Sequence, residues 1–552
     1  MASQELPLTE SFWPADGSVP LRDLTVGDLL REAAQDSPDV VGLVAGVPGV
    51  DRRWTFAEML ADAEQVAAAL LARFSPGERV AVWAPNLPEW VLLEFGAGLA
   101  GVVLVTVNPA YQPHELAYVL GQSGAAGVFL VADWRGNPMR ASLDAVCGDL
   151  EDLREVIMFE EWDTFLASAS TSGVLPDVGP DDPAQIQYTS GTTGFPKGAL
   201  LRHGGLTDNA ALFAAVAEIG AGDVYVNPMP MFHTAGCVLG ALGTVQARAV
   251  HVPVIAFDPG FVLELIERER GTALLGVPTM QIALLEHPDL ESRDLSSLRS
   301  SVSGGSLVPA DLVRRIESSF GVQFCIVYGT TECSPLVTMT RFDDTPEDKA
   351  ETIGRAMPQT EVKIADPITG DLVAPGVVGE LCARGYMVMR GYFEDEAATA
   401  EAIDADGWYH TGDLASMDER GYCRIEGRLK DMIIRGGENI YPREIEDVLF
   451  AHPSVADVAV VGIPDDRWGE QVAAFVRING DDLPTPAALS AHVRGQLAGF
   501  KVPRTWVFVE TFPLTGSGKV QKFVLRDRLL AGELTPAPTP HDGERAAPRG
   551  VA

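Results

Sequence analysis

The chain has 552 residues, of which 46% are hydrophobic and 21% are charged, and its formal net charge is −36 at neutral pH. This length exceeds what one ordinary hydrophobic core requires, so we expect two to four domains or subdomains. The strongly acidic balance argues against nucleic acid and against anionic membranes as partners, because both need a basic face.

Alternating strand and helix signals fill the first two thirds of the chain. Apolar helical stripes are expected over 26–35 and from about 54 to 73, the second with a threonine cap. Further strands are expected at 79–83, 102–107, 126–131, 224–226, 251–255, 273–277, 300–303 and 323–328, and further helices at 87–100, 259–270 and 308–320. This alternation predicts an α/β fold with a mostly parallel sheet.

The last third of the chain changes character twice. Residues 350–427 contain short β segments and many turn glycines, which predicts a small β-barrel-like subdomain. Residues 428–533 alternate helix and strand signals again and are enough for a compact α+β domain. We therefore predict a large N-terminal domain (1–427) of two α/β subdomains plus the β-barrel-like subdomain, a small C-terminal domain (428–533) and a disordered tail (534–552).

Cysteine usage and the N-terminal segment bear on the compartment. The six cysteines show no paired spacing, which predicts free buried thiols in a reducing environment. The N-terminal residues show no basic segment followed by an apolar one, so no secretory signal is expected. The most apolar stretch, 95–107, is too short to span a bilayer. We expect a cytoplasmic protein without an integral membrane segment.

A glycine-rich segment at 188–198 reads Tyr-Thr-Ser-Gly-Thr-Thr-Gly-Phe-Pro-Lys-Gly. Glycines let a backbone turn sharply and approach a ligand, and successive amides in such a turn bind anions. The segment therefore suits a polyphosphate, although its spacing is not that of a Walker A loop. The expected phosphate contacts are Thr189, Ser190, Gly191, Thr192, Thr193, Gly194 and Lys197. A flexible surface loop is the alternative interpretation.

Six further segments carry groups suited to chemistry, and they are 228–233, 303–306, 328–332, 408–413, 427–442 and 513–519. The segments at 303–306 and 328–332 both follow expected strands. They should therefore lie at the carboxyl ends of a sheet, where open α/β folds bind ligands.

With these motifs in order from about residue 25 to 530, the chain resembles the adenylate-forming superfamily, which includes acyl- and aryl-CoA synthetases. The segments Ile434-Arg-Gly-Gly-Glu-Asn-Ile-Tyr-Pro442 and Val107-Asn-Pro-Ala-Tyr111 are most similar to its fatty acyl-CoA synthetase branch. The resemblance implies an enzyme that joins a carboxylate to ATP, forming acyl-AMP and pyrophosphate, and then transfers the acyl group to CoA with release of AMP. It implies ATP, Mg²⁺ and coenzyme A as ligands. A homodimer is one candidate assembly.

The resemblance also implies a role for each motif. Glu332 would bind Mg²⁺, a hard cation that takes oxygen ligands, and Thr331 would contact the α-phosphate. Asp413 would accept hydrogen bonds from the ribose hydroxyls, with Arg428 nearby. The adenine would lie between Tyr328 and the segment Gly304, Gly305 and Ser306, and Gly329 and Thr330 are further expected cofactor-binding residues.

Three more roles follow from the same resemblance. Lys519 would bridge the carboxylate and the α-phosphate, cancelling charge where two anions meet. Lys430 would be the hinge about which a mobile C-terminal domain rotates. After that rotation, Gly436, Gly437 and Glu438 would face the pantetheine channel.

The substrate class is read from the pocket segment 232–237, where His233 would line the acyl entrance. Amino-acid-activating relatives place an aspartate in this segment, and here there is none. We therefore expect a hydrophobic acid, with a medium- or long-chain fatty acid favoured. The alternatives are an aryl or other carboxylate–CoA ligase, or an enzyme that loads acyl-AMP onto an acyl carrier protein.

Overall fold

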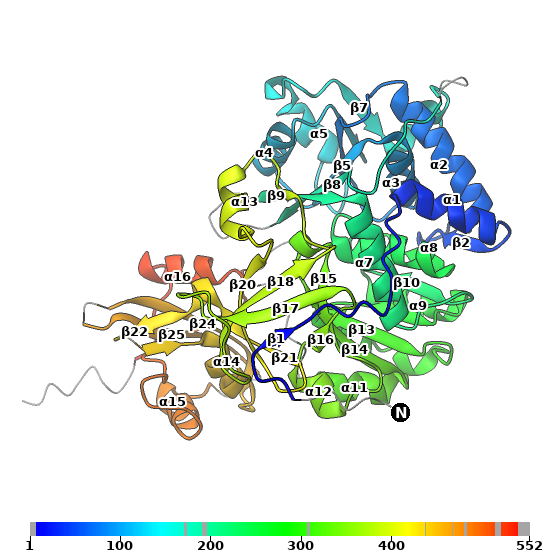
Figure 1. Ribbon diagram of the computed structural model, residues 1–552. Coiled ribbons are helices and arrows are strands. Elements are labelled where there is room, and N and C mark those ends of the chain that lie inside the picture. Colours follow the sequence, from blue (N-terminus) through cyan, green and yellow to red (C-terminus); the bar gives the residue numbers. More distant parts are fainter. Residues whose placement is uncertain are drawn as a thin grey trace, which may run out of the picture.

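The computed structural model describes residues 7–169, 174–189, 196–305, 308, 310–436, 438–465, 467–479, 483–513 and 520–538 (Figure 1). Four sheets organise these residues, and the expected α/β fold with a large N-terminal part and a small C-terminal part is confirmed. None of the helices within the described residues has the length and apolar character needed to cross a bilayer.

A seven-stranded sheet carries the glycine-rich segment on its hairpin β8–β9. In spatial order its strands are β19 (Gly391–Tyr392), β9 (Lys197–Arg202), β8 (Pro183–Thr189), β5 (Val103–Val107), β4 (Arg79–Trp83), β6 (Gly127–Leu130) and β7 (Glu155–Met158). Strands β8 to β7 are parallel, whereas β9 and β19 are antiparallel additions at one edge. Strand β5 is a buried apolar run with one threonine, as expected for a parallel sheet covered on both faces.

A nine-stranded sheet contains the second group of motifs at its strand ends. In spatial order its strands are β16 (Arg355–Ala356), β15 (Leu336–Met339), β14 (Gln323–Gly329), β13 (Ser300–Gly304), β12 (Ala273–Leu275), β10 (Val224–Asn227), β11 (Val250–Pro253), β2 (Val41–Val44) and β3 (Arg53–Thr55). Strands β14 to β2 are parallel. The expected helix from about 54 begins instead at Phe56, because Arg53–Thr55 pair with β2.

Helices between the two α/β sheets bury one continuous core. This layer consists of α1 (Val26–Asp36), α2 (Phe56–Leu71), α3 (Pro88–Ala100), α7 (His203–Val216), the π-helix η3 (Ala235–Leu242) and α8 (Gly243–Ala247). Helix α3 contacts β5 of one sheet, while α8 and η3 contact β11 of the other. The largest hydrophobic cluster therefore joins residues of both sheets.

The remaining helices of the α/β part lie outside this layer or in connections. Beside the seven-stranded sheet are α4 (Pro113–Ser123), α5 (Met139–Asp144), η1 (Cys147–Asp149), η2 (Phe159–Glu161) and α6 (Trp162–Leu166). Along the nine-stranded sheet follow α9 (Pro259–Glu269), α10 (Pro278–Leu285), η4 (Leu290–Ser292), α11 (Ala310–Phe320), η5 (Thr331–Cys333) and α12 (Pro346–Glu351). Apolar side chains of α9 and α11 form a second cluster on the outer face of this sheet.

A five-stranded antiparallel sheet forms the β subdomain. Its strands in order are β1 (Phe12–Trp13), β17 (Thr360–Ala365), β18 (Gly379–Gly385), β20 (Tyr409–Met417) and β21 (Cys423–Arg428), with helix α13 (Glu396–Ala402) before β20. In the described residues the outer strands β1 and β21 do not pair, so this region is a sheet and not a closed barrel.

The C-terminal part has its own sheet and lies beside the β subdomain (Figure 1). It comprises η6 (Leu429–Asp431), β22 (Ile433–Arg435), β23 (Glu438–Ile440), α14 (Pro442–Phe450), β24 (Val455–Asp465), β25 (Gly469–Ile478), α15 (Pro486–Arg494), β26 (Thr505–Phe508) and α16 (Lys522–Leu530). The prediction of a disordered tail from 534 is wrong for its first residues. Ala537 donates its N–H to the Trp506 carbonyl at 2.7 Å and packs against a core cluster.

Candidate active site

Three predicted nucleotide contacts meet where the nine-stranded sheet approaches the β subdomain. The Tyr328 hydroxyl at the end of β14 donates to Asp413 Oδ2 at 2.7 Å. The other oxygen of Asp413 lies 3.0 Å from Arg428 Nε, and the Asp413 side chain is only 9% exposed. Burial, followed by the neighbouring carboxylate, raises the pKa of Tyr328 well above its usual range. We call Tyr328, Asp413 and Arg428 the ribose clamp, after the role that the sequence resemblance predicts for Asp413.

Two glycines beside this clamp allow a close approach of neighbouring backbone. Strand β13 runs parallel to β14, and Gly304 lies opposite Val327. A Cβ atom at Gly304 would stand 2.4 Å from the Val327 carbonyl oxygen, so only glycine fits. Gly305 has φ +78°, in the left-handed region that favours glycine. Backbone alone therefore forms this wall beside Tyr328.

The turn after β14 places Glu332 next to the glycine-rich hairpin. Glu332 is buried in η5, and its Oε1 accepts a hydrogen bond from the Tyr392 hydroxyl at 2.8 Å. The Lys197 ammonium lies 4.9 Å from the centre of the Tyr392 ring. Thr189 and Lys197 face each other across the hairpin. A buried carboxylate oxygen and a lysine thus converge at the base of the predicted phosphate loop.

Backbone geometry fixes the same turn tightly. Thr330 N–H donates to the Pro335 carbonyl at 2.9 Å, and a Cβ atom at Gly329 would lie 2.0 Å from that oxygen. The Thr330 hydroxyl is buried without a hydrogen-bond partner among the described residues. Thr331, which is buried, starts η5 directly after it. An unpaired hydroxyl and a rigid turn are features of a site shaped for a polar ligand.

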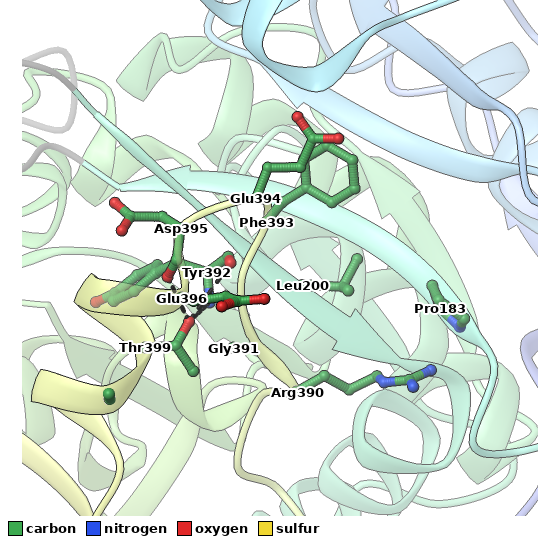
Figure 2. Close-up of a pocket in the computed structure, with 11 residues that line it drawn as sticks. Pro183, Leu200, Arg390, Gly391, Tyr392, Phe393, Glu394, Asp395, Glu396 and Thr399 are labelled. Atoms are coloured by element: carbon green, nitrogen blue, oxygen red, sulfur yellow. Dashed lines mark hydrogen bonds between the residues drawn. The ribbon is translucent and has the colours of Figure 1, made fainter.

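The backbone of Tyr392 is hydrogen-bonded to helix α13. Thr399 Oγ1 of this helix accepts the Tyr392 backbone N–H at 2.8 Å, as Figure 2 shows. A shallow pocket of about 520 Å³ opens here between β9 and the segment 390–400. No residue of the ribose clamp lines this pocket, whereas Tyr392, the hydrogen-bond partner of Glu332, does.

The predicted acyl entrance opens onto an apolar π-helix. His233 is half-buried, and its carbonyl accepts the N–H groups of Gly236 and Cys237 at 2.8 and 3.1 Å. Helix η3 then runs from Ala235 to Leu242, and all its residues after the first are buried. π-Helical turns occur frequently at functional sites. The structure thus brings His233 to the start of a buried apolar element.

A buried polar chain lies behind this π-helix. Gln185 Nε2 donates to Glu94 Oε1 at 2.7 Å, and Gln187 Nε2 donates to Gln185 Oε1 at 2.7 Å and to Cys237 Sγ at 3.2 Å. Burial raises the pKa of Glu94 well above its usual range. These polar groups connect the hairpin strand β8 with η3 through the core.

The predicted hinge lies between the β subdomain and the C-terminal part. Lys430 is exposed in the single turn η6, which links β21 to β22. Gly436 has φ +63°, and a Cβ atom there would stand 2.6 Å from the Trp468 ring. Gly436 begins the segment 436–438, which is predicted to face the pantetheine channel.

Several predicted residues lie outside the described part of the chain. They are Ser190, Gly191, Thr192, Thr193, Gly194, Ser306, Gly437 and Lys519, together with the side chain of Glu438. The ends of the segment that contains Lys519 are joined, since Gln521 N–H donates to the Pro513 carbonyl at 2.8 Å.

Two contributors to the site were missed by sequence reasoning. Tyr392 stands in a short turn-rich stretch, where a lone tyrosine gives no signal of its partner 60 residues away. Glu380 follows a glycine in an ordinary-looking strand, and its contact with the segment before Asp413 appears only once β18 and β20 are paired. His410 lies inside the motif at 408–413, whose pattern assigns no role to it.

Comparisons with known proteins identify the family of this chain. The family model for AMP-binding enzymes matches residues 30–393, and the model for the AMP-binding enzyme C-terminal domain matches 444–519. A putative acyl-CoA synthetase, YngI, of Bacillus subtilis is 42% identical over 92% of this chain and 97% of its own. The mitochondrial medium-chain acyl-CoA ligase ACSF2 of Rattus norvegicus is 39% identical over 92% and 87%. The crystal structure of ATP-bound MatB from Rhodopseudomonas palustris superposes with a TM-score of 0.83 at 32% identity, over 91% and 99%.

Proposed function

Because this chain belongs to the AMP-binding enzymes of the adenylate-forming superfamily, and is an acid–thiol ligase of the acyl-CoA synthetase type, we propose that it activates a medium- or long-chain fatty acid. In the first step a carboxylate oxygen attacks the α-phosphorus of ATP. The bond from that phosphorus to the bridging oxygen breaks, and pyrophosphate leaves. In the second step the CoA sulfur attacks the acyl carbon, AMP leaves, and the thiol proton is lost.

The ribose clamp is the observation that carries the nucleotide part of this proposal. Asp413 offers a nearly buried carboxylate beside Tyr328, at strand ends where ligands of α/β folds bind. Such a carboxylate can accept hydrogen bonds from both ribose hydroxyls. Gly304 and Gly305 have no side chain that would stand between an adenine and the Tyr328 ring.

A divalent cation fits the chemistry of Glu332. Its carboxylate is buried close to the glycine-rich hairpin, and hard cations such as Mg²⁺ take oxygen ligands and bridge phosphate oxygens. When bound there, Mg²⁺ would neutralise charge on the phosphates. Tyr392 would orient the carboxylate, Lys197 would add a positive charge at the β,γ-phosphate end, and Thr331 would contact the α-phosphate.

Lys519 is proposed as the residue that brings the two anions together. A lysine that contacts both the acid and the α-phosphate cancels repulsion between them, which is electrostatic positioning and not base catalysis. Rotation of the C-terminal part about Lys430 would withdraw Lys519 and present the 436–438 segment to the pantetheine arm of CoA. Two half-reactions then share one acyl site.

The substrate class follows from the walls near His233. Helix η3 contributes a buried apolar surface without any acidic residue, so a substrate ammonium has no partner there. Medium-chain acids are the first choice because several relatives carry the name medium-chain acyl-CoA ligase.

The decisive assay measures AMP formation with ATP and CoA across straight-chain acids of increasing length, with aryl acids as a comparison series. We expect the highest kcat/KM among medium- or long-chain acids. Pyrophosphate release that is independent of CoA, combined with transfer to a carrier protein, would instead identify an acyl-AMP ligase. Absence of product with every acid would refute the ligase proposal.

A lysine variant tests the division of labour. Lys519→Ala is expected to abolish acyl-AMP formation while leaving thioester formation from supplied acyl-AMP largely intact. Lys522→Ala, three residues away in α16, is the matched control and should leave the adenylation step intact. Equal loss of both steps in Lys519→Ala would contradict the rotation of the C-terminal domain.

A further inference from the structure

Three side chains of different chemistry converge on two neighbouring strands of the β subdomain. Glu380 and Cys382 lie on β18, and His410 lies opposite Cys382 on β20 (Figure 1). Their ligand atoms are all within 4.8 Å of one another. Glu380 and Cys382 are buried, whereas His410 is about one-third exposed.

Strand β20 is irregular immediately after this cluster. Cys382 pairs with His410 and Glu380 pairs with Leu414, so two steps along β18 correspond to four along β20. The extra residues form a bulge that contains Asp413. Gly412 in this bulge has φ +69°. A bulge re-aims the side chains within it and leaves backbone groups without ladder partners.

The Glu380 side chain contacts residues of β20 where regular pairing between β18 and β20 is interrupted. Its Oε1 accepts the Gly412 N–H at 3.1 Å, and its Oε2 lies 2.8 Å from His410 Nδ1. On the other side of the imidazole, Nε2 lies 3.5 Å from Asp404 Oδ2. One carboxylate therefore ties together both residues that flank Thr411.

Thr411 completes the fastening of the bulge. Its hydroxyl donates to the Leu381 carbonyl at 2.7 Å, and the same oxygen accepts the Asp413 N–H at 3.1 Å. Toward β18 the backbone of Asp413 is thus held through side chains, whereas toward β21 it keeps a strand pair with Arg428. From this position its carboxylate accepts the Tyr328 hydroxyl.

We propose that Glu380, braced by His410, is a positioning residue that holds the Thr411–Gly412 bulge so that Asp413 faces the ribose. This inference rests on the nucleotide part of the proposed function. Glu380 itself touches neither Asp413's carboxylate nor the clamp tyrosine in any contact of the described residues, so its effect must pass through the backbone.

Glu380, Cys382 and His410 are also residue types that bind metal ions, and their ligand atoms lie close enough together to hold one. Both oxygens of Glu380 already have N–H partners, and the Cys382 sulfur and the Glu380 carboxylate raise the pKa of His410 to about 10. A metal ion would have to displace that proton from Nδ1. The hydrogen-bonded brace is therefore the interpretation that the contacts favour.

The test compares binding of ATP with binding of 2′,3′-dideoxy-ATP, using calorimetry on the full chain. Wild type should bind ATP about 10-fold or more tightly than the dideoxy analogue, because two hydrogen bonds to a carboxylate are lost. Glu380→Ala should weaken ATP binding by about 10-fold and leave the analogue nearly unchanged, so that discrimination collapses. The exposed Glu419, on the turn after β20, provides the control Glu419→Ala, which should keep full discrimination.

Several results would overturn the proposal. Equal weakening of both nucleotides in Glu380→Ala would reveal a general structural role, and a stoichiometric transition metal in the purified chain would replace the brace by a metal site. Should Glu380→Ala fail to fold, the milder Glu380→Gln is measured in the same way, with loss of discrimination again required. These binding ratios do not depend on turnover, so a failure of the ligase proposal is recognised separately by the absence of acid-dependent pyrophosphate release.

Discussion

Replacing Asp413 by asparagine removes the negative charge of the ribose clamp while conserving its shape. In the structure the carboxylate accepts from Tyr328 at 2.7 Å and pairs with Arg428 at 3.0 Å. A hydrogen bond to a charged acceptor contributes about 1.5–3 kcal/mol and a neutral one about 0.5–1.5 kcal/mol. With two ribose hydroxyls bound, the loss is about 2–3 kcal/mol, which corresponds to a roughly 30- to 150-fold lower kcat/KM for ATP.

The assay is continuous pyrophosphate release at saturating acid with ATP as the varied substrate. Asp371→Asn changes another carboxylate of the β subdomain, one that lies on its exposed surface, and should leave kcat/KM unaltered. The KM for the acid should also stay constant in Asp413→Asn. In the described residues, the hydrogen bond and the ion pair of Asp413 do not involve the pocket segment 232–237. A decrease of less than about threefold in kcat/KM for ATP would refute ribose recognition by this carboxylate.

Three other perturbations test separate parts of the site. Tyr392→Phe removes the donor to Glu332, and the Mg²⁺ concentration for half-maximal activity should rise about 5- to 10-fold, whereas a fall would mean that the hydroxyl competes with the ion. Gly304→Ala places a Cβ atom 2.4 Å from the Val327 oxygen, so the urea midpoint should drop by the equivalent of about 1–3 kcal/mol, and an unchanged midpoint would contradict this close approach. Burial raises the pKa of Glu94 above its ordinary 4.5, so the folded chain retains a proton that the unfolded chain releases, and stability is lost as pH rises toward the folded value. Glu94→Gln should therefore gain stability relative to wild type in thermal unfolding as the pH rises above the ordinary pKa of 4.5, and a constant difference would exclude a protonated Glu94.

Motifs at strand ends were the most predictable part of the site. Tyr328 and the 304–305 glycines follow apolar runs, and the ends of neighbouring parallel strands must lie together once the sheet forms. Asp413 could be assigned only through the resemblance, because its strand belongs to another sheet. Local pattern thus indicates which segments end at a binding edge, whereas the meeting of two sheets is decided by tertiary packing.

The features that escaped prediction depend on contacts far apart in sequence or on small backbone irregularities. Strand β1 pairs with β17 across more than 340 residues, and two residues carry no periodicity. The π-helix η3 looks in sequence like any short apolar helix, because one widened turn changes no residue type. Threonine at 55 was recognised as a cap, but the pairing of Arg53–Thr55 with β2 moved the helix start to Phe56.

The three N-terminal sheets explain why the site needs the whole N-terminal part. Tyr328 comes from the nine-stranded sheet, Asp413 from the β subdomain, and Tyr392 from the edge of the seven-stranded sheet. Neither the ribose clamp nor the hydrogen-bonded pair of Glu332 and Tyr392 is complete within one sheet. A ligand that contacts both must favour the packed arrangement of all three over any state in which one sheet separates, because only the packed state offers every contact. The bulge in β20 belongs to this arrangement, because it interrupts the pairing with β18 at Asp413 while the strand pair of Asp413 with Arg428 on β21 is kept.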